Sequence, residues 1–555
     1  MEQDADTTSG ASAAAPADAG LERRRLRAAT LVFAAATALS RVAGLLREMA
    51  TSYVFGASST YSAFVIANQI PNLLRSLVAD SALSAAFVPV FTELDERGER
   101  DRAWRVASAV CGVIIAVLGP LTVLAMVLAP AIVTPFLDEN FSQPDIDLTI
   151  SLARVLMPIV LVLALSGVVV GIQNTYGRFG AAALAPVAWN AVILIGLAVA
   201  AIWFPEDDQI WIYAIGMVVG TVVQALLPAP WLRGLGGRLR LRASWRDPKV
   251  REVFILMLPI TLSLGLINVQ QFISALLAAK VDANVGGLLG GLDAGAGPAI
   301  LDKAFRIYML PQGIFSVAVT TVVFPLLSRM SARGDRRGFA EAVDLGLRQI
   351  LMLLVPSSVF LGAFCVPVTR LLYERGEFDA AQTEAVAYAL AAFAIGLTFN
   401  GLTLLLIRSL FSLKLTWLPT WVSIATLAVN LVVALLSYQA WGVLGIAMAT
   451  SIANVVGVVL LYGLLAARTD PLGTRRTLGV ALGTIVAAAV GVGVAAAATY
   501  LVWEPAFGTG TMATLGAVTA ALAIAAPIYL WVGGRLGAVR PGLVRSLLRR
   551  GAAEE

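Results

Sequence analysis

The chain has 555 residues, of which 59% are hydrophobic and only 14% are charged, and its formal net charge is +5. Soluble globular chains average roughly 45–50% apolar and 25% charged residues, so this composition indicates a membrane protein and excludes a disordered chain, a coiled coil and a disulfide scaffold. The sequence contains no histidine, which excludes Ser-His-Asp catalysis and His-ligated metal sites. Cys111 and Cys365 each stand alone in an apolar run, and we expect buried free thiols, with a disulfide between them as the alternative.

Apolar runs long enough to cross a bilayer follow one another along the chain. A membrane-spanning helix needs about 20 apolar residues. Fourteen such runs cover approximately 29–53, 61–92, 106–135, 148–174, 181–203, 209–231, 252–279, 299–327, 343–369, 383–408, 416–438, 442–467, 477–502 and 511–534. The sequence therefore predicts an all-α, polytopic membrane protein with about 14 transmembrane helices.

Positive charge is concentrated in alternate loops. The N-terminal cluster, the loops after even-numbered runs and the C-terminal tail hold 30 of the 40 lysines and arginines. The intervening loops are acidic or neutral; residues 136–147 carry four acids and no base, and residues 204–209 carry three acids and no base. Cationic loops stay on the cytoplasmic side, so both termini are predicted to be cytoplasmic.

An internal repeat divides the chain. The segment DERGER (95–100) aligns with SARGDR (331–336) at an offset of 236 residues, and Pro89 then meets Pro325. Two halves that both begin inside form a parallel repeat, a transporter feature in which the substrate site lies between the lobes; the alternative is chance similarity among membrane helices. The predicted organisation is a disordered cytoplasmic tail (1–27), an N-lobe (28–232), a basic cytoplasmic linker (233–250), a C-lobe (251–467), two additional helices (468–534) and a basic cytoplasmic tail (535–555).

Arginines inside the apolar runs carry the strongest functional signal. An arginine at a helix centre costs about 2.5–3.5 kcal/mol, so four facing lipid would cost roughly 10–14 kcal/mol. They must therefore face a polar cavity or acidic partners. The four are Arg41, Arg47, Arg75 and Arg306.

Two interpretations of these arginines stay open. Glu48, Asp80 and Asp302 lie in the same runs and could neutralise them as structural ion pairs, above all for Arg47 beside Glu48. Alternatively the arginines bind an anion, because the planar guanidinium grips phosphate oxygens with two hydrogen bonds and cannot be deprotonated. Several of them converging in a bilayer cavity suit a diphosphate and do not suit an organic cation, which needs carboxylates or aromatic rings.

Several motifs resemble the MurJ (MviN) family of lipid II flippases, within the multidrug/oligosaccharidyl-lipid/polysaccharide exporter superfamily. The resemblance covers about residues 28–470. Its N-terminal block is the most specific part. The matching motifs are SRVAGLLR (40–47), FGA (55–57), PNLLR (71–75), ADSALSAAFVP (79–89), Arg306 five residues before PQG (311–313), LYERGEF (372–378) and GIAMATS (445–451).

The resemblance implies two lobes around a central cationic cavity with alternating access. The family's cavity arginines fall on Arg41, Arg47, Arg75 and Arg306, which are the predicted substrate-binding residues. Secondary cavity candidates are Glu48, Ser62, Asn72 and Asp80; at Ser62 the family has an acidic residue. Some members bind sodium in the second lobe, and the corresponding ion-site candidates are Gln270, Asn430 and Thr450, none of which is a carboxylate.

The resemblance further implies a bacterial inner-membrane protein that moves lipid II, the undecaprenyl-diphosphate disaccharide-pentapeptide, to the outer leaflet. We expect no enzyme activity and no cofactor, and coupling to the membrane potential or an ion gradient. The expected partners are lipid II, membrane lipids and other cell-wall synthesis or division proteins, but no nucleic acid. The alternatives are an ion-driven multidrug or oligosaccharide exporter of the same superfamily and a membrane scaffold without transport of its own.

Overall fold

The first part of the chain folds into eight long helices. The computed structural model describes residues 16–78, 81–137, 141–240, 244–281, 292, 295–415 and 417–539, and all regular elements in these residues are helical. We group as the first lobe the helices α1 (Pro16–Phe55), α2 (Ser59–Val78), α3 (Ser81–Glu96), α4 (Arg100–Val133), α5 (Gln143–Leu156), α6 (Pro158–Thr175), α7 (Phe179–Trp203) and α8 (Glu206–Leu226), with short 3-10 turns at Thr134–Phe136 and Ala229–Leu232.

The rest of the chain adds a linking helix, a second lobe and a C-terminal pair. The linking helix is α9 (Pro248–Ala279). The second lobe consists of α10 (Gly297–Pro311), a π-helical turn (Gln312–Ser316), α11 (Val317–Arg333), α12 (Arg336–Ala363), α13 (Cys365–Tyr373), α14 (Ala380–Ser412) and α15 (Trp417–Ala466). The C-terminal pair is α16 (Thr474–Ala498) and α18 (Thr511–Arg535), joined by a π-helical turn (Thr499–Trp503) and α17 (Glu504–Phe507).

The helices confirm the all-α polytopic prediction. Ten helical stretches of the described residues are long and apolar enough to cross a membrane. The longest, α15, breaks at Gly442, where φ is +56°, and so holds two of the predicted runs. The remaining runs fall on α1, on α2 with α3, and on α9, so each of the fourteen predicted runs coincides with helix.

Helix boundaries repeat between the lobes. Helices α3 and α11 begin 236 residues apart, as do α4 and α12. Helices α5 and α14 begin 237 residues apart, which matches the single-residue slip between the two halves of the sequence. These three pairs of helix starts follow the offset of the sequence repeat, although the paired helices differ in length.

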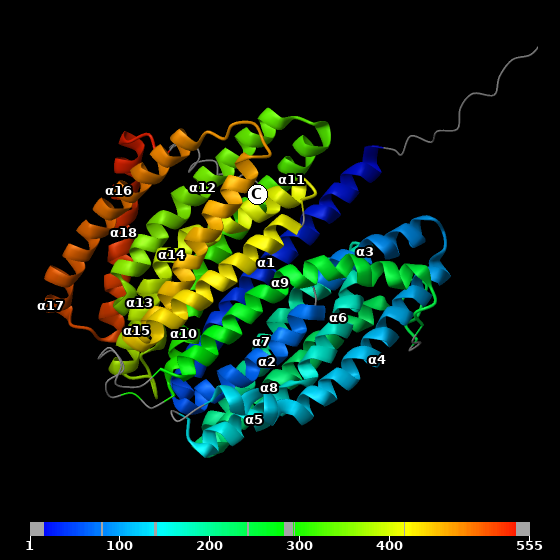
Figure 1. Cartoon of the computed structure of the whole chain (residues 1–555), viewed down its shortest axis with the longest axis horizontal. Coiled ribbons are helices and arrows are strands. Elements are labelled where there is room, and N and C mark those ends of the chain that lie inside the picture. The colour runs from blue at the N-terminus through cyan, green and yellow to red at the C-terminus, as the bar shows by residue number, and fades with distance from the viewer. Residues whose placement is uncertain are drawn as a thin grey trace, which may run out of the picture.

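The two lobes join at one end of the molecule. Figure 1 shows α1 and α9 running between the first lobe and the second lobe. The beginning of α9 packs into the first lobe, where Val250, Val253 and Met257 belong to the same apolar cluster as residues of α3, α4 and α6. The other end of α9 packs in a larger cluster that is shared by both lobes. That shared cluster contains Phe55 and Tyr61 of the first lobe and Tyr373 and Phe378 of the second.

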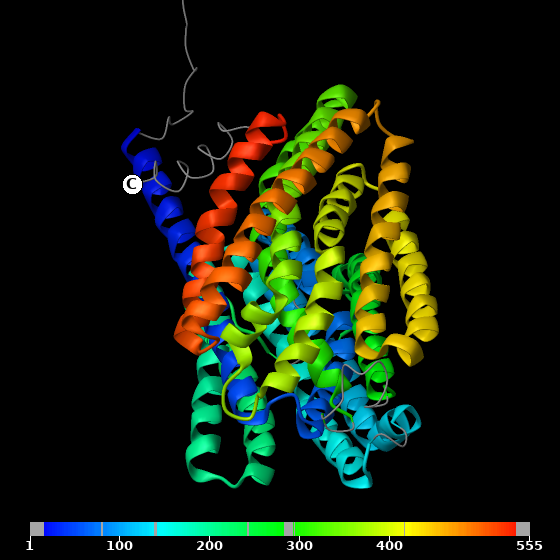
Figure 2. The same cartoon turned by 90° about the vertical axis from the view of Figure 1, so that its left-hand side faces the viewer.

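Helices α16 and α18 form a hairpin on the outer side of the second lobe. Figure 2 shows the two helices side by side, with α16 against α12. Their backbones approach closely at Gly491, where a Cβ atom would lie 2.8 Å from the carbonyl oxygen of Ala525. A larger residue at this position would separate the two helices. The hairpin is therefore a tightly packed unit attached to α12 and α13.

Two predictions about local features can be compared with the structure. The disordered tail predicted for residues 1–27 differs from the structure, in which α1 already begins at Pro16. Residues 16–27 are rich in Ala, Leu and Arg, which favour helix. Residues 1–15 and 540–555 lie outside the described residues. Cys111 in α4 and Cys365 at the start of α13 are both unpaired; Cys111 is buried and Cys365 is half-buried.

Candidate functional site

A polar cavity lies where α1, α2 and α10 meet α6, α7 and α8. Its volume is about 330 Å³, near the lower end of the range of about 300–1,000 Å³ for small-molecule sites. Its charged lining residues are Arg47 and Glu48 from α1, Arg75 from α2, and Asp302 and Arg306 from α10.

Three of the four predicted arginines meet in this cavity. Arg47 is buried, Arg75 is half-buried and the side chain of Arg306 is 41% exposed. Arg47 and Arg75 come from the consecutive helices α1 and α2, whereas Arg306 comes from α10, more than 200 residues further along the chain. The fold therefore brings the three guanidinium groups to one space. Two carboxylates accompany three arginines, and the lining therefore keeps an excess of positive charge.

Ion pairs tie two of the arginines to the carboxylates. Arg47 Nη2 lies 2.5 Å from Glu48 Oε1, and its guanidinium also lies over the ring of Trp189 at 4.6 Å. Arg306 lies 3.2 Å from Asp302 and 3.8 Å from Glu48. In the described part of the chain Arg75 forms no ion pair, so its charge is not neutralised there.

Some hydrogen-bonding groups around the buried pair have no partner. Arg47 Nε and Nη1 and Glu48 Oε2 are buried and form no hydrogen bond in the described structure. Unsatisfied buried donors of a charged group are costly, and phosphate oxygens are acceptors that a guanidinium binds well. An anion would supply the acceptors that these groups lack once the surroundings of Arg47 shift to admit it.

Arg41 lies apart from the other three arginines. It is exposed on α1 and does not belong to the cavity lining. Its guanidinium contacts the π-helical turn of the second lobe, where a Cβ atom on Gly313 would lie 3.0 Å from Arg41 Nη1. The missing side chain at Gly313 leaves the space that Arg41 occupies, so this arginine bridges the lobes beside the cavity.

The secondary candidates occupy different places. Glu48 and Asn72 line the cavity. Ser62 is fully buried outside the lining, and its Oγ accepts a hydrogen bond of 3.1 Å from the backbone N–H of Ala299 at the start of α10. Asp80 lies outside the described residues.

The predicted ion-site residues lie on α9 and α15. Asn430 Nδ2 donates a hydrogen bond of 3.2 Å to Thr450 Oγ1, and both residues are buried. Asn430 Oδ1 has no partner in the described structure. Gln270 is half-buried on α9, which packs along α15. Within the described ranges, no group of three or more Asp, Glu, Cys or His side chains could hold a metal ion.

Sequence reasoning missed Lys303, which lies next to the cavity. Its side chain is fully buried, and Nζ donates a hydrogen bond of 2.8 Å to Thr51 Oγ1. Nζ also lies 4.3 Å from the ring centre of Tyr61 and 5.4 Å from that of Tyr373. The sequence feature that could have identified Lys303 is its position three residues before Arg306, because this spacing places both residues on neighbouring faces of α10.

Hydrogen bonds join the lobes at the α1–α2 turn, beyond the part of α1 that lines the cavity, in what we call the lobe seam. The backbone N–H of Glu377 donates to the carbonyl of Tyr53 at 3.0 Å, and that of Ala57 donates to Gln382 Oε1 at 2.7 Å. Gly56 has a φ of +59°, and a Cβ atom there would lie 2.6 Å from the carbonyl oxygen of Glu377. The seam, Tyr53, Gly56, Ala57, Glu377 and Gln382, therefore holds the lobes together at the α1–α2 turn.

Charged residues connect α3 with α9 at the opposite end. Lys249 Nζ donates a hydrogen bond of 2.7 Å to Glu93 and lies 2.9 Å from Glu252. The bond from Lys249 lowers the pKa of the Glu93 carboxyl, and the same bond raises the pKa of Lys249. These pairs keep the start of α9 attached to the first lobe.

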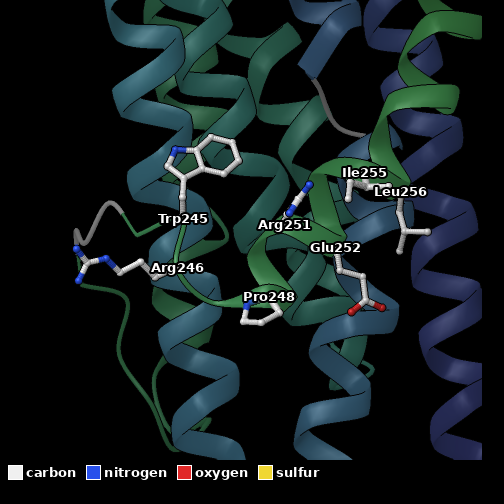
Figure 3. A pocket seen from close by; sticks show the side chains of 7 residues that line it. All are labelled: Trp245, Arg246, Pro248, Arg251, Glu252, Ile255 and Leu256. Atoms are coloured by element: carbon white, nitrogen blue, oxygen red, sulfur yellow. The ribbon is translucent and has the colours of Figure 1, made fainter.

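A second hollow, of about 450 Å³, lies at the start of α9 (Figure 3). Arg251 lies between the ring of Trp245 and the apolar side chain of Ile255, whereas Arg246 points away from them. The ring of Trp245 packs against Phe254 at 5.1 Å. This hollow combines a cation, an aromatic ring and exposed aliphatic side chains.

Membrane-spanning helices around a polar, cation-rich cavity, together with the family that the chain matches, define the class of this protein: it is a membrane transporter and not an enzyme. The family model for lipid II flippase MurJ matches residues 51–518. This chain belongs to the lipid II flippase MurJ family.

Individual relatives agree with this assignment. The probable lipid II flippase MurJ of Rhizobium meliloti (strain 1021) is 29% identical over 93% of this chain and 95% of its own length. The lipid II flippase MurJ of Burkholderia cenocepacia is 31% identical over 66% of this chain and 70% of its own length.

Solved structures share the fold. A lipid II flippase MurJ in an inward closed conformation superposes with a TM-score of 0.72 and 23% identity, over 90% of this chain and 98% of that one. An inward-facing multidrug resistance MATE family transporter of the MOP superfamily gives a TM-score of 0.62 and 15% identity, over 79% of this chain and 98% of that one.

Proposed function

We propose that this protein is a flippase that moves lipid II from the cytoplasmic to the outer leaflet by alternating access. The single observation that carries the proposal is the meeting of Arg47, Arg75 and Arg306 in one cavity with only two carboxylates. The relatives named as lipid II flippases support the choice of cargo. The three arginines bind the diphosphate, and the remaining headgroup passes between the lobes.

The cavity size supports a mechanism in which the lobes must move. A volume of about 330 Å³ admits a diphosphate but not a disaccharide-pentapeptide, so the cavity has to widen around the headgroup. The lobe seam joins the lobes beyond one end of the cavity, and the headgroup therefore enters from the other end. The polyprenyl tail stays in the bilayer, because moving it through a charged cavity would remove apolar surface from lipid.

We assign the lobe seam to the outer face and both termini to the cytoplasm. Labelling of single cysteines in whole cells with an impermeant maleimide tests this orientation. Ser142→Cys and Asp207→Cys are expected to react from outside, and Arg97→Cys and Arg246→Cys only after permeabilisation, because cationic loops stay cytoplasmic. Reaction of Arg246→Cys in intact cells would contradict the assignment, and Cys111→Ala with Cys365→Ala supplies the background.

The two alternative functions are less well supported. The MATE-like fold is compatible with drug export, but a cavity with excess positive charge disfavours an organic cation. A scaffold without transport has no need for arginines that cost about 2.5–3.5 kcal/mol each in a membrane. Both alternatives leave the shared cavity of Arg47, Arg75 and Arg306 without a purpose.

The hollow at the start of α9 fits a second partner class, the membrane lipids. Lys249 is already paired with Glu93 and Glu252, so Arg246 and Arg251 supply the local excess of positive charge. Trp245, Ile255 and Leu256 are exposed and offer apolar surface beside these arginines (Figure 3). This combination suits an anionic phospholipid of the cytoplasmic leaflet. We also propose contacts with other cell-wall synthesis or division proteins, as the family resemblance implies.

The proposed function is tested by the accessibility of lipid II. In proteoliposomes loaded with lipid II on one face, the purified protein is expected to expose lipid II to a membrane-impermeant modifying enzyme on the other face. Liposomes without the protein give the control rate. Equal exposure with and without the protein, at equal protein insertion, would contradict flippase activity.

A further inference from the structure

Lys303 is a buried cation that the diphosphate contacts described above do not use. Its ammonium contacts one hydroxyl, that of Thr51, and the rings of Tyr61 and Tyr373, and it forms no ion pair with a described residue. Tyr373 in turn donates a hydrogen bond of 3.4 Å to the backbone carbonyl of Lys303. Glu48 and Asp302 act on this ammonium only from beyond ion-pair distance. Burying an ammonium without a directly paired carboxylate is costly, and an apolar side chain of similar length would fill the same space without that cost.

The position of Lys303 lies between the cavity and the lobe seam. On α10 it is three residues closer to the helix start than Arg306, a separation of about 4.5 Å along the axis. Its partner Thr51 is likewise one turn beyond Arg47 on α1, and Thr51 donates to the carbonyl of Glu48 at 2.9 Å. The next turn of α1 contains Tyr53, where the seam begins. Lys303 is therefore the next cation on the path from the cavity toward the seam.

The contacts of Lys303 cross between the lobes. Lys303 belongs to the second lobe, whereas Thr51 and Tyr61 belong to the first. Any motion that parts the lobes at the seam removes both contacts and leaves the ammonium without its hydrogen-bond acceptor. An uncovered ammonium beside a cavity that holds a diphosphate gains a charge-assisted hydrogen bond from the phosphate oxygens.

We propose that Lys303 is a second binding station for the diphosphate, covered while the lobe seam is closed and available when it opens. This inference rests on the proposed flippase function. The diphosphate shifts by about one helical turn, from Arg306 toward Lys303, as the seam parts. Because the contact with Lys303 exists only in the open state, the cargo binds that state more tightly and so promotes opening.

A reporter cysteine in the seam measures this coupling. Ala57 is buried beside Gln382, so Ala57→Cys in a chain with Cys111→Ala and Cys365→Ala reacts with maleimide only when the seam opens. In the parent, lipid II is expected to accelerate labelling. In Lys303→Met, lipid II binding by native mass spectrometry is expected to stay within about threefold of the parent, whereas the lipid II-dependent acceleration falls roughly ten- to hundredfold.

Two further variants separate the charge from its present contact. Lys303→Arg is expected to keep the acceleration, because the cation remains. Thr51→Val removes the hydrogen-bond acceptor and is expected to keep the acceleration while raising the basal labelling rate. If Lys303 served only to hold the lobes together, Thr51→Val would lose the acceleration as Lys303→Met does. The response of Thr51→Val alone therefore tests the proposal when Lys303→Met does not fold.

The outcomes distinguish this inference from the proposed function. Full acceleration in Lys303→Met, or its loss in Thr51→Val, overturns the second station and leaves the flippase proposal intact. A parent that neither binds lipid II nor responds to it overturns the proposed function itself. Binding with an intact response in the parent, and binding without a response in Lys303→Met, supports both.

Discussion

Arg306→Ala is expected to abolish lipid II flipping while the protein still accumulates in the membrane. Arg306 pairs with Asp302 at 3.2 Å and lies 3.8 Å from Glu48, so its loss leaves two arginines facing two carboxylates. The excess positive charge of the cavity then disappears. Losing one charge-assisted contact costs about 1.5–3 kcal/mol, or roughly ten- to hundredfold in lipid II affinity. Native mass spectrometry measures the affinity, and complementation of flippase-depleted cells measures function.

Matched variants separate anion binding from structural pairing at Arg306. Arg306→Lys is expected to lower lipid II binding, because an ammonium is a point charge without the two-pronged guanidinium geometry. Arg306→Gln combined with Asp302→Asn removes both members of the pair and is expected not to restore function. Arg333→Ala, in the exposed last turn of α11, controls for the loss of an arginine elsewhere. Restoration by the double variant would instead assign Arg306 a structural role and favour the exporter alternative.

Linking the two sides of the lobe seam is expected to stop transport completely. Ala57 and Gln382 belong to opposite lobes and are joined by a hydrogen bond of 2.7 Å. Ala57→Cys with Gln382→Cys, bridged by a short bifunctional maleimide in a chain with Cys111→Ala and Cys365→Ala, holds the lobes together. Because the headgroup can leave only when the lobes part, lipid II exposure in proteoliposomes should fall to the protein-free rate.

The single-cysteine variants treated with the same reagent control for modification alone, and each should keep most of the activity. Lipid II binding is expected to persist in the linked protein, because Arg47, Arg75 and Arg306 lie beyond the seam. Continued transport by a fully cross-linked sample would show that the seam does not open during the cycle.

The sequence predicted most of the helices, because the length of an apolar run reflects the thickness of the bilayer and the distribution of charged loops reflects its two sides. The break in α15 follows from the glycine at position 442. The matching starts of α3 and α11 follow from the internal repeat. The start of α1 was not predicted, since the residues after Pro16 are not apolar although they favour helix. Membrane hydropathy does not detect a helix that extends beyond the bilayer.

The site was predicted less completely, because hydropathy places an arginine in the membrane without saying which way it faces. At 100° per residue, Ser40 and Arg47 share one face of α1, and both line the cavity. Arg41 is turned by about 100° from Ser40 and accordingly lies against Gly313 instead. The same rotation separates Lys303 from Asp302 on α10, and only the packing between the two lobes shows that Lys303 is fully buried.

The hairpin of α16 and α18 enlarges the second lobe in the plane of the bilayer. Because it packs on α12 and α13, it adds two membrane-crossing helices to the second lobe and enlarges that lobe's lateral footprint. In a viscous membrane the body with the larger cross-section experiences more drag and rotates through the smaller angle. We therefore expect the first lobe, which carries Arg47 and Arg75, to swing against a comparatively stationary second lobe when the protein changes state.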